Sequence, residues 1–400
     1  MIATDTRNAT LADLADLLKR QQEAKVDFVA PSTALRMTDG LLHVRGVEPE
    51  ITDDGVTLAD GVYRPSDVMD AGIAGALDVP VSYLRRLRNT RVDVYDLTVN
   101  RLLAGLTKRS ADGTVTVVYP ADPRSFLIRA FRDADGGPGY GRAWLSTKYR
   151  MIDNLDVLTA ALTGIREAGV DVDVTQCDLT DSTMHIRVAC PSVTALAPTL
   201  LKGYRSPFGQ GVARAGGTPD DRPTHDGLPI VFAGFSIRNS EVGRGRFTIT
   251  PVITVQVCTN GMVMTADQLG RTHLGARLDD GIVAWGDDTQ AKAAELVTLQ
   301  ARDAVRSFVN PEYLTAKVAE LEALAGAPVT DPAATVKRLG SQLKIDQGTT
   351  DAILNHFILG GQMTAAGIAN AMTSVAQTLP NADAAFDLEA LAVRAMTLAA

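Results

Sequence analysis

Residues 230–264 constrain the fold of this chain more than any other stretch. From Phe247 to Val257 apolar residues occupy every second position, with mainly polar residues between them, which is typical of a strand with one buried face. The run 230–237 alternates in the same way, more loosely. Two such runs joined by a short segment predict an antiparallel hairpin, and Asn260-Gly261 predicts a second turn, of type I′.

The segment between the two runs, residues 239–245, contains two glycines and an asparagine, which adopt positive φ readily. It brings Arg238, Arg244 and Arg246 close together at one end of the hairpin. We therefore expect an antiparallel meander with a basic turn. A meander of this kind is a scaffold, and its pattern specifies no reaction by itself.

Apolar periodicity elsewhere predicts helices packed on such a sheet. Residues 153–169 carry an apolar stripe at helical spacing, and residues 170–188 alternate as a third hairpin. We therefore predict an α+β fold: an antiparallel β-meander with packed helices, plus an α-helical C-terminal region. The expected parts are a mixed N-terminal region over 1–110, a core domain over 111–286 and a helical region over 287–400.

Two short blocks of sequence resemble a known family. NSEVG at 239–243 is followed by CTNGM at 258–262, and RAWLSTKYRMIDNLDVLTAAL occupies 142–162. These blocks are similar to the uncharacterised phage/plasmid-like protein family, whose members occur in phages, prophages and plasmids. The resemblance covers roughly residues 120–275. It implies a mobile-element gene acting in a bacterial cytoplasm, and it implies no catalytic residue.

The composition agrees with a protein of the cytoplasm. At 400 residues the chain has room for two or three domains, and 46% hydrophobic residues supply their cores. No apolar run reaches the length of a membrane span, and residues 1–25 lack the apolar core of a signal peptide, so we expect no membrane contact. Three cysteines without CxxC spacing indicate reduced thiols; a bridge between Cys177 and Cys190 is the alternative.

Charge is spread unevenly along the chain, whose net charge is −8. Residues 85–150 contain 13 lysines and arginines against 6 acidic residues, whereas residues from 287 onward contain 8 against 13. This asymmetry favours one face for an anionic partner. Dispersal of the basic residues among unrelated strands explains the same numbers.

The sequence shows no set of residues with the spacing of a catalytic site or a metal site. The five histidines lack a second histidine or a carboxylate at metal-ligand spacing, and the serines lack a nucleophile-elbow setting. The glycine-rich loop at 136–141 lacks the motif of a nucleotide loop. The acidic pairs Asp279-Asp280 and Asp287-Asp288 are more typical of loops than of a cation site. We therefore predict no catalytic residue, no metal and no cofactor, and we favour a protein that is not an enzyme.

These patterns favour a nucleic-acid-binding protein, by analogy with single-strand binding or annealing proteins of recombination and replication. Two blocks carry basic residues beside turns, and aromatic rings nearby would stack on bases. In the competing interpretation, Glu241 and Asp153 pair with the arginines and stabilise the domain instead. The predicted contacts to single-stranded DNA are Arg142, Lys148, Tyr149, Arg150, Arg238, Arg244 and Arg246.

Two further segments are candidates for DNA contact. Residues 71–89 resemble a helix-turn-helix with a basic second helix, although a plain helical hairpin fits them too. Residues 202–229 predict a long loop that is either a single-strand-binding arm or a disordered excursion. The alternative function is a non-enzymatic interaction factor whose acidic helical tail binds a host or phage protein. A homo-oligomer is compatible with either function.

Overall fold

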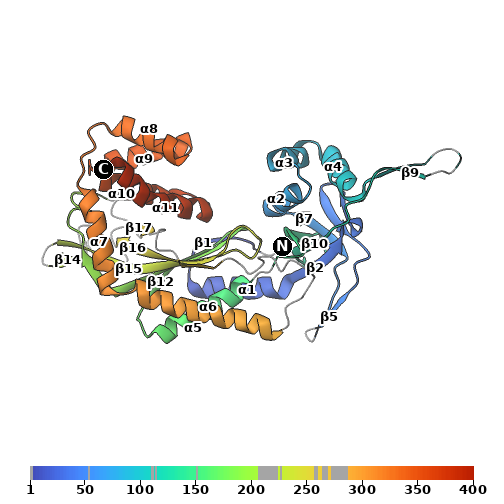
Figure 1. Ribbon diagram of the computed structural model, residues 1–400, viewed down its shortest axis with the longest axis horizontal. Coiled ribbons are helices and arrows are strands. Elements are labelled where there is room, and N and C mark those ends of the chain that lie inside the picture. The colour runs from blue at the N-terminus through green and yellow to red at the C-terminus, as the bar shows by residue number, and fades with distance from the viewer. Residues whose placement is uncertain are drawn as a thin grey trace.

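The computed structural model describes residues 3–52, 55–109, 112, 115–149, 152–205, 224–225, 228–255, 260–263, 269–271 and 287–400. The protein is α+β, as the sequence predicts, with two main sheets and with helices on both faces of the larger one (Figure 1). We call these sheets the large sheet and the small sheet. Within the described ranges, no helix is long and apolar enough to cross a membrane.

The large sheet consists of antiparallel strands, namely β1 (Thr6–Ala9), β12 (Asp173–Leu179), β13 (Met184–Leu196), β14 (Thr224–His225), β15 (Leu228–Asn239), β16 (Phe247–Val255), β17 (Asn260–Val263) and β18 (Leu269–Arg271). Their order is β1-β12-β13-β15-β16-β17, with β14 beside β15 and β18 beside β16. The hairpins β12–β13 and β15–β16 confirm the alternation seen in the sequence.

Two details of this meander differ from the prediction. Asn260-Gly261 pairs with the end of β16, so these residues belong to β17 and the connection precedes them, at positions outside the described residues. The second difference concerns the polar face of β16. Thr248 and Thr250 are only 2% and 1% exposed, so the strand is buried on both faces and not on one.

Three helices cover one face of the large sheet: α1 (Leu11–Ala24), α5 (Asn154–Ala168) and α6 (Asp287–Phe308) (Figure 1). Apolar residues such as Ile186, Phe235 and Ile249 of the strands share a core with these helices. α5 and α6 approach closely because Gly164 has no side chain. A Cβ at this position would lie 2.3 Å from the Thr298 carbonyl oxygen.

The C-terminal region is helical, as predicted, and packs on the opposite face of the large sheet (Figure 1). Its helices are α7 (Pro311–Ala325), α8 (Pro332–Leu343), α9 (Gln347–Gly360), α10 (Ala365–Thr378) and α11 (Ala382–Ala399). They share an apolar core with Val231, Ala233 and Ile253 of the sheet. These three apolar residues alternate along the strands with Ser236, Arg238 and Thr250, so they lie on the other side of the sheet from the polar side chains that contact α11.

Six strands form the small sheet: β2 (Lys25–Pro31), β3 (Leu35–Thr38), β4 (Leu41–Val44), β7 (Gly61–Pro65), β10 (Ser125–Phe131) and β11 (Gly139–Ser146). Their order is β2-β10-β11-β7-β4-β3, and only the β7–β11 pairing is parallel among the described strands. Met69, Leu84 and Tyr95 pack on this sheet from the helices α2 (Asp67–Ala76), α3 (Val81–Thr90) and α4 (Val92–Ala104).

Two hairpins stand outside the small sheet. β5 (Glu50–Thr52) pairs with β6 (Gly55–Thr57), and β8 (Leu106–Arg109) pairs with β9 (Val115–Tyr119). The β8–β9 hairpin projects far from the rest of the chain (Figure 1). The sequence pattern had placed its second strand in the core domain.

The two sheets divide the chain differently from the predicted parts. β1 and α1 belong with the large sheet, whereas residues 25–146 build the small sheet and its helices before the chain returns to α5. We call residues 25–146 the small-sheet lobe; it is an insertion between α1 and α5. The predicted boundary near residue 110 is wrong, because β10 and β11 lie beyond it and complete the sheet that β2 begins.

Candidate nucleic-acid interface

The connection between β15 and β16, residues 239–246, is a tight corner held by its own side chains. The Asn239 amide donates to the backbone just ahead of α5 at 3.1 Å. Ser240 Oγ donates to the Ser182 carbonyl at 2.6 Å and accepts the Arg244 N–H at 3.0 Å. Gly243 has a φ of 79°, which is the left-handed conformation that glycine adopts without strain. The NSEVG block therefore has a structural role in shaping this corner.

Glu241 connects the corner to the small-sheet lobe. One of its carboxylate oxygens accepts the Asn154 N–H at 2.8 Å, and the other pairs with the Arg142 guanidinium. Its backbone carbonyl accepts a hydrogen bond of 2.7 Å from Arg129. Arg129 lies on β10 and Arg142 on β11, so this one residue of the large sheet's hairpin holds two strands of the small sheet.

Arg129 is the centre of a buried group of charges at this junction. Its side chain is 0% exposed, and its guanidinium lies 2.7 Å from both Asp27 and Asp153. Lys25 contacts Asp153 at 2.5 Å. The group has no net charge, which is what stability at a buried site requires, since an unpaired buried ion costs several kcal/mol. We call it the ion cluster: Lys25, Asp27, Arg129, Arg142, Asp153 and Glu241.

The ion cluster shifts the pKa values of its members. Burial tends to raise the pKa of Asp153, but Arg129 and Lys25 outweigh burial and hold that pKa well below its usual range. Glu241 is also desolvated, yet Arg142 and Arg129 lower its pKa. Burial opposes the charge on Arg129, and the neighbouring carboxylates nevertheless raise its pKa. Asp153, Glu241 and Arg129 are therefore charged at neutral pH.

Arg142 was predicted to contact DNA, and its surroundings favour the competing interpretation. It is only 9% exposed, its guanidinium lies 4.2 Å from the centre of the Phe131 ring, and Glu241 neutralises it. Its side chain is not available to a ligand in this structure, so we remove it from the interface. The expected acidic partner Asp153 pairs with Arg129 and not with Arg142.

Sequence reasoning missed Arg129 and Lys25. A signal for Arg129 was present, because it is the one charged residue in the otherwise largely apolar strand 125–131. A charge at such a position needs a buried partner. The sequence could not name that partner, since Asp27 and Asp153 lie far away along the chain.

Arg238, a second predicted contact, is covered by α11. Its guanidinium lies 5.4 Å from the centre of the Phe386 ring, 3.9 Å from Asp383 and 3.8 Å from Asp387. Long ion pairs of this kind contribute little to stability when solvent reaches them. Arg238 is thus engaged on the helix-covered face of the large sheet and is not presented at the exposed corner.

Three predicted contacts are exposed: Lys148, Arg244 and Arg246. We call these three residues the basic turns, because Lys148 lies in the turn after β11 and the two arginines lie in the corner. No ion pair joins any of them to another residue in the described ranges. The remaining predicted contact of this block, Arg150, lies outside the described residues.

The two turns touch each other through Tyr149 and Gly243. A Cβ on Gly243 would lie 3.8 Å from the Tyr149 ring. Tyr149 is partly buried, and desolvation raises its pKa. Val242, the next residue of the corner, packs with Val68 at the start of α2. The basic turns therefore lie at the junction of the two sheets, where the hairpin tip reaches α2 (Figure 1).

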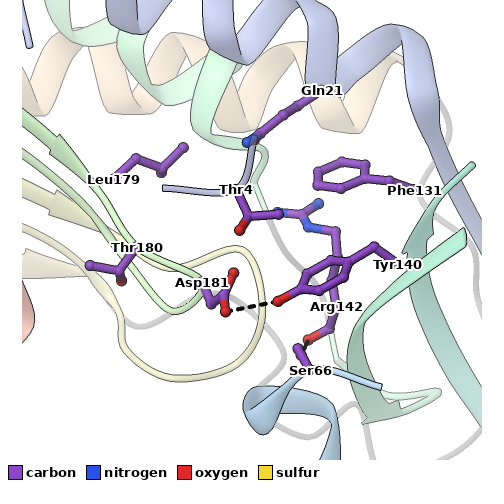
Figure 2. Close-up of a pocket in the computed structure, with 9 residues that line it drawn as sticks. All are labelled: Thr4, Gln21, Ser66, Phe131, Tyr140, Arg142, Leu179, Thr180 and Asp181. Atoms are coloured by element: carbon purple, nitrogen blue, oxygen red, sulfur yellow. Dashed lines mark hydrogen bonds between the residues drawn. The ribbon is translucent and has the colours of Figure 1, made fainter. Parts of the chain in front are cut away.

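A small pocket lies beside the ion cluster (Figure 2). Tyr140 reaches across the junction from β11, and its hydroxyl donates to Asp181 at 2.8 Å. The Arg142 guanidinium points past Tyr140 toward Phe131 (Figure 2). The cavity measures about 10 Å³, which is room for about one water molecule. This junction is packed, and the pocket is too small for a ligand.

The predicted helix-turn-helix segment forms two helices, α2 and α3, joined by a short turn. Asp78 in that turn has a φ of 54°, the left-handed conformation that a glycine frequently supplies. Two of the basic residues of α3 are engaged: Arg85 donates to the Asp67 carbonyl at 2.6 Å, and Arg88 contacts Asp70 at 3.0 Å. The helical geometry is confirmed, and DNA contact by α3 stays a prediction.

The remaining candidates add no site. Tyr204, from the predicted long loop at 202–229, is buried against Gly360 of α9, and positions 206–223 of that loop lie outside the described residues. In the part of the chain that the structure describes, no group of histidine, cysteine, aspartate and glutamate residues is arranged to hold a metal ion. Cys177 and Cys190 are both free, so the alternative of a disulfide between them is wrong.

Comparisons of the chain with known protein families, with curated proteins and with solved structures found no match. The resemblance to phage/plasmid-like proteins therefore stays a prediction.

Proposed function

We propose that the protein is a nucleic-acid-binding protein of a phage or other mobile element, and that the basic turns contact single-stranded nucleic acid. One observation carries the proposal. Two turns from different sheets bring Lys148, Arg244 and Arg246 to one exposed junction, and none of them pairs with an acidic residue of the described chain. Cations without a protein partner are suited to phosphate oxygens.

The rigidity of the corner supports this proposal. Ser240 fixes the Arg244 backbone, and Glu241 anchors the corner to the ion cluster. A ligand that binds a preformed turn loses less affinity to the ordering of the protein. The buried arginines thus hold the exposed ones in place, and they need not touch the ligand.

The expected binding is modest and depends strongly on salt. Each phosphate contact to a single strand contributes about −0.7 to the slope of log K against log salt, so three contacts give about −2. Affinity should then fall about 15-fold when salt rises fourfold. Fluorescence anisotropy of a labelled oligothymidine at several salt concentrations measures this slope.

Alanine variants test whether the basic turns contact the oligothymidine. Replacing the three residues of the basic turns with alanine should abolish most of the salt-dependent binding and leave thermal unfolding unchanged. A matched control replaces three exposed cations elsewhere on the protein and should bind like wild type. If wild type does not bind, or if both variants lose affinity equally, the proposal is wrong. The variants are Lys148→Ala, Arg244→Ala and Arg246→Ala, with Lys19→Ala, Arg20→Ala and Lys337→Ala as the control.

A second candidate function, contact with a second copy of this chain, is favoured by the β8–β9 hairpin. Val115, Val117 and Tyr119 are 54%, 61% and 65% exposed on this projecting hairpin (Figure 1). Apolar residues that follow one another along an exposed strand are typical of a contact surface. Val117→Lys should then lower the molar mass of any oligomer seen by light scattering without changing binding of the oligothymidine. An unchanged mass would remove the support for this candidate.

A further inference from the structure

The face of the large sheet beneath the start of α11 is polar, whereas a sheet face covered by a helix is ordinarily apolar. Alternate residues of β13, β15 and β16 form this face in two rows, with one residue from each strand in each row. We call them the polar strip: His185, Arg187, Ser236, Arg238, Thr248 and Thr250.

α11 covers the polar strip with acidic residues. The Asp383 carboxylate lies 2.7 Å from His185 Nε2 and 3.9 Å from Arg238. Asp387, one helical turn further along, lies 3.8 Å from the other terminal nitrogen of Arg238. The helix thus places carboxylates over the cations of the sheet in the way that a strand of phosphates would.

A second pair extends this arrangement inward. Glu389 is buried and pairs with both terminal nitrogens of Arg187. Burial raises the pKa of Glu389, although Arg187 opposes the shift. Exchanging a buried ion pair for apolar packing is frequently neutral or stabilising. Stability alone therefore gives no reason for a polar contact at this place.

The polar strip is also left with unused hydrogen-bonding groups. The hydroxyl groups of Ser236, Thr248 and Thr250 have no hydrogen-bond partner among the described residues, and neither has His185 Nδ1. Buried polar groups in proteins nearly always have partners. Several buried polar groups without partners on one surface are expected where that surface has a functional role besides packing.

The contact between α11 and the polar strip is incomplete. A cavity of about 370 Å³ lies between them, lined by Arg187, Ser236, Phe386 and Glu389 among others. Such a volume lies within the range of ligand-binding cavities. Apolar packing lies beside this cavity, because Phe386 packs on Val252 of β16, and Ala385 and Leu388 belong to the core of the C-terminal helices. The polar strip is therefore filled by neither apolar packing nor a complete set of hydrogen bonds.

We propose that the polar strip is a second part of the nucleic-acid surface and that α11 occupies it in the free protein, its carboxylates taking the place of phosphates. The inference rests on the proposed function, because the polar strip adjoins the basic turns. Arg238 leads into the corner that carries Arg244, and Arg246 stands two residues before Thr248. Arginine, histidine and hydroxyl groups are the usual ligands of phosphate oxygens.

The test removes the carboxylates through which α11 contacts Arg238 and keeps the ion pair between Glu389 and Arg187. The variant Asp383→Asn with Asp387→Asn removes the carboxylates beside Arg238 and keeps Glu389. Affinity for oligothymidine at low salt should rise about five- to tenfold, and the salt slope should steepen by about 0.7 for each phosphate gained. The control Asp16→Asn with Asp351→Asn changes the net charge equally at exposed positions and should gain much less.

Adding Arg238→Ala to the double variant should return the affinity to that of wild type. Hydrogen exchange supplies a second measurement: amides of residues 382–389 should lose protection in the double variant, while those of α10 keep it. Equal gains in the double variant and its control would overturn the inference. Unchanged protection of residues 382–389 would overturn it as well, because these carboxylates would then not hold the helix.

The same experiments separate this inference from the proposed function. If wild type binds through the basic turns and the double variant gains nothing over its control, the inference fails and the proposed function stands. If the double variant binds through Arg238 while alanine at the basic turns has no effect, the polar strip is a site and the basic turns are not.

Discussion

Glu241→Gln tests whether the ion cluster holds the two sheets together. Glutamine has nearly the same size, and its carbonyl can still accept the Asn154 N–H that Glu241 accepts at 2.8 Å. The pair with Arg142 is lost, and so is the attraction of Arg129 at 3.9 Å. The buried cluster then carries one uncompensated positive charge. Removing one partner of a buried ion pair costs about 3–5 kcal/mol.

We expect a loss near the lower end of this range, about 3 kcal/mol, because one of the hydrogen bonds survives. That is a large part of the roughly 5–15 kcal/mol by which a typical domain is stable. Urea unfolding followed by circular dichroism measures the loss. Since the cluster joins the small-sheet lobe to the large sheet, the variant should also unfold in two steps where wild type unfolds in one.

The loss of stability in Glu241→Gln should depend on pH. The folded-state pKa of Glu241 is lowered, so its contribution to stability is present above its unfolded pKa and is lost as pH falls through the folded value. The difference between wild type and Glu241→Gln should therefore shrink in acid. The control Asp93→Asn breaks an exposed pair with Arg91, at 3.0 Å, and should change nothing measurable. A loss below about 1 kcal/mol at neutral pH, in a single transition, would refute this account of the cluster.

Three further predictions concern other buried positions. Burial raises the pKa of Asp70 to about 6 despite Arg88, so the folded state binds this proton more tightly than the unfolded chain. The free energy of unfolding of Asp70→Asn should therefore rise relative to wild type by up to about 3 kcal/mol as pH goes from 4 to 7. Urea unfolding measures this difference, and a difference that does not change with pH would contradict the prediction. Gly164→Ala should cost about 1–3 kcal/mol, because α5 and α6 must separate, whereas Gly75→Ala, with open space around it, should not destabilise; equal melting temperatures would be evidence against this packing. Burial raises the pKa of Cys177 to about 12, so a thiol reagent should modify it only on unfolding, and prompt labelling of the folded protein would count against its burial.

The sequence predicted the elements whose signal is local. Alternation between 230 and 255 predicted β15 and β16, and the stripe at 153–169 predicted α5, because side-chain period follows directly from backbone geometry. Asp39 and Gly40, between β3 and β4, both adopt positive φ, which is the turn geometry that an Asp-Gly pair favours. These features depend on neighbours within a few residues.

What the sequence could not predict depends on distant partners. Nothing in the run 125–131 says that it pairs with β2 at residues 25–31, so the insertion of the small-sheet lobe went unseen. The same limit applies to function. Arg142 and Arg244 look alike in the sequence, and only the folded chain shows that Glu241 neutralises the first while the second stays exposed. Thr248 and Thr250 alternate as solvent-facing residues do, whether or not a helix covers them.

The insertion of the small-sheet lobe has a consequence for the order of events during synthesis. The Asn8 N–H donates to Asp178, which lies 170 residues further along the chain. At about 5–20 residues per second, β1 leaves the ribosome roughly 10–30 seconds before β12 exists. The small-sheet lobe can complete its own sheet during that interval, while α1 has no sheet to cover. The apolar side of α1, which includes Leu14, Leu17 and Leu18, is therefore made well before the strands that bury it.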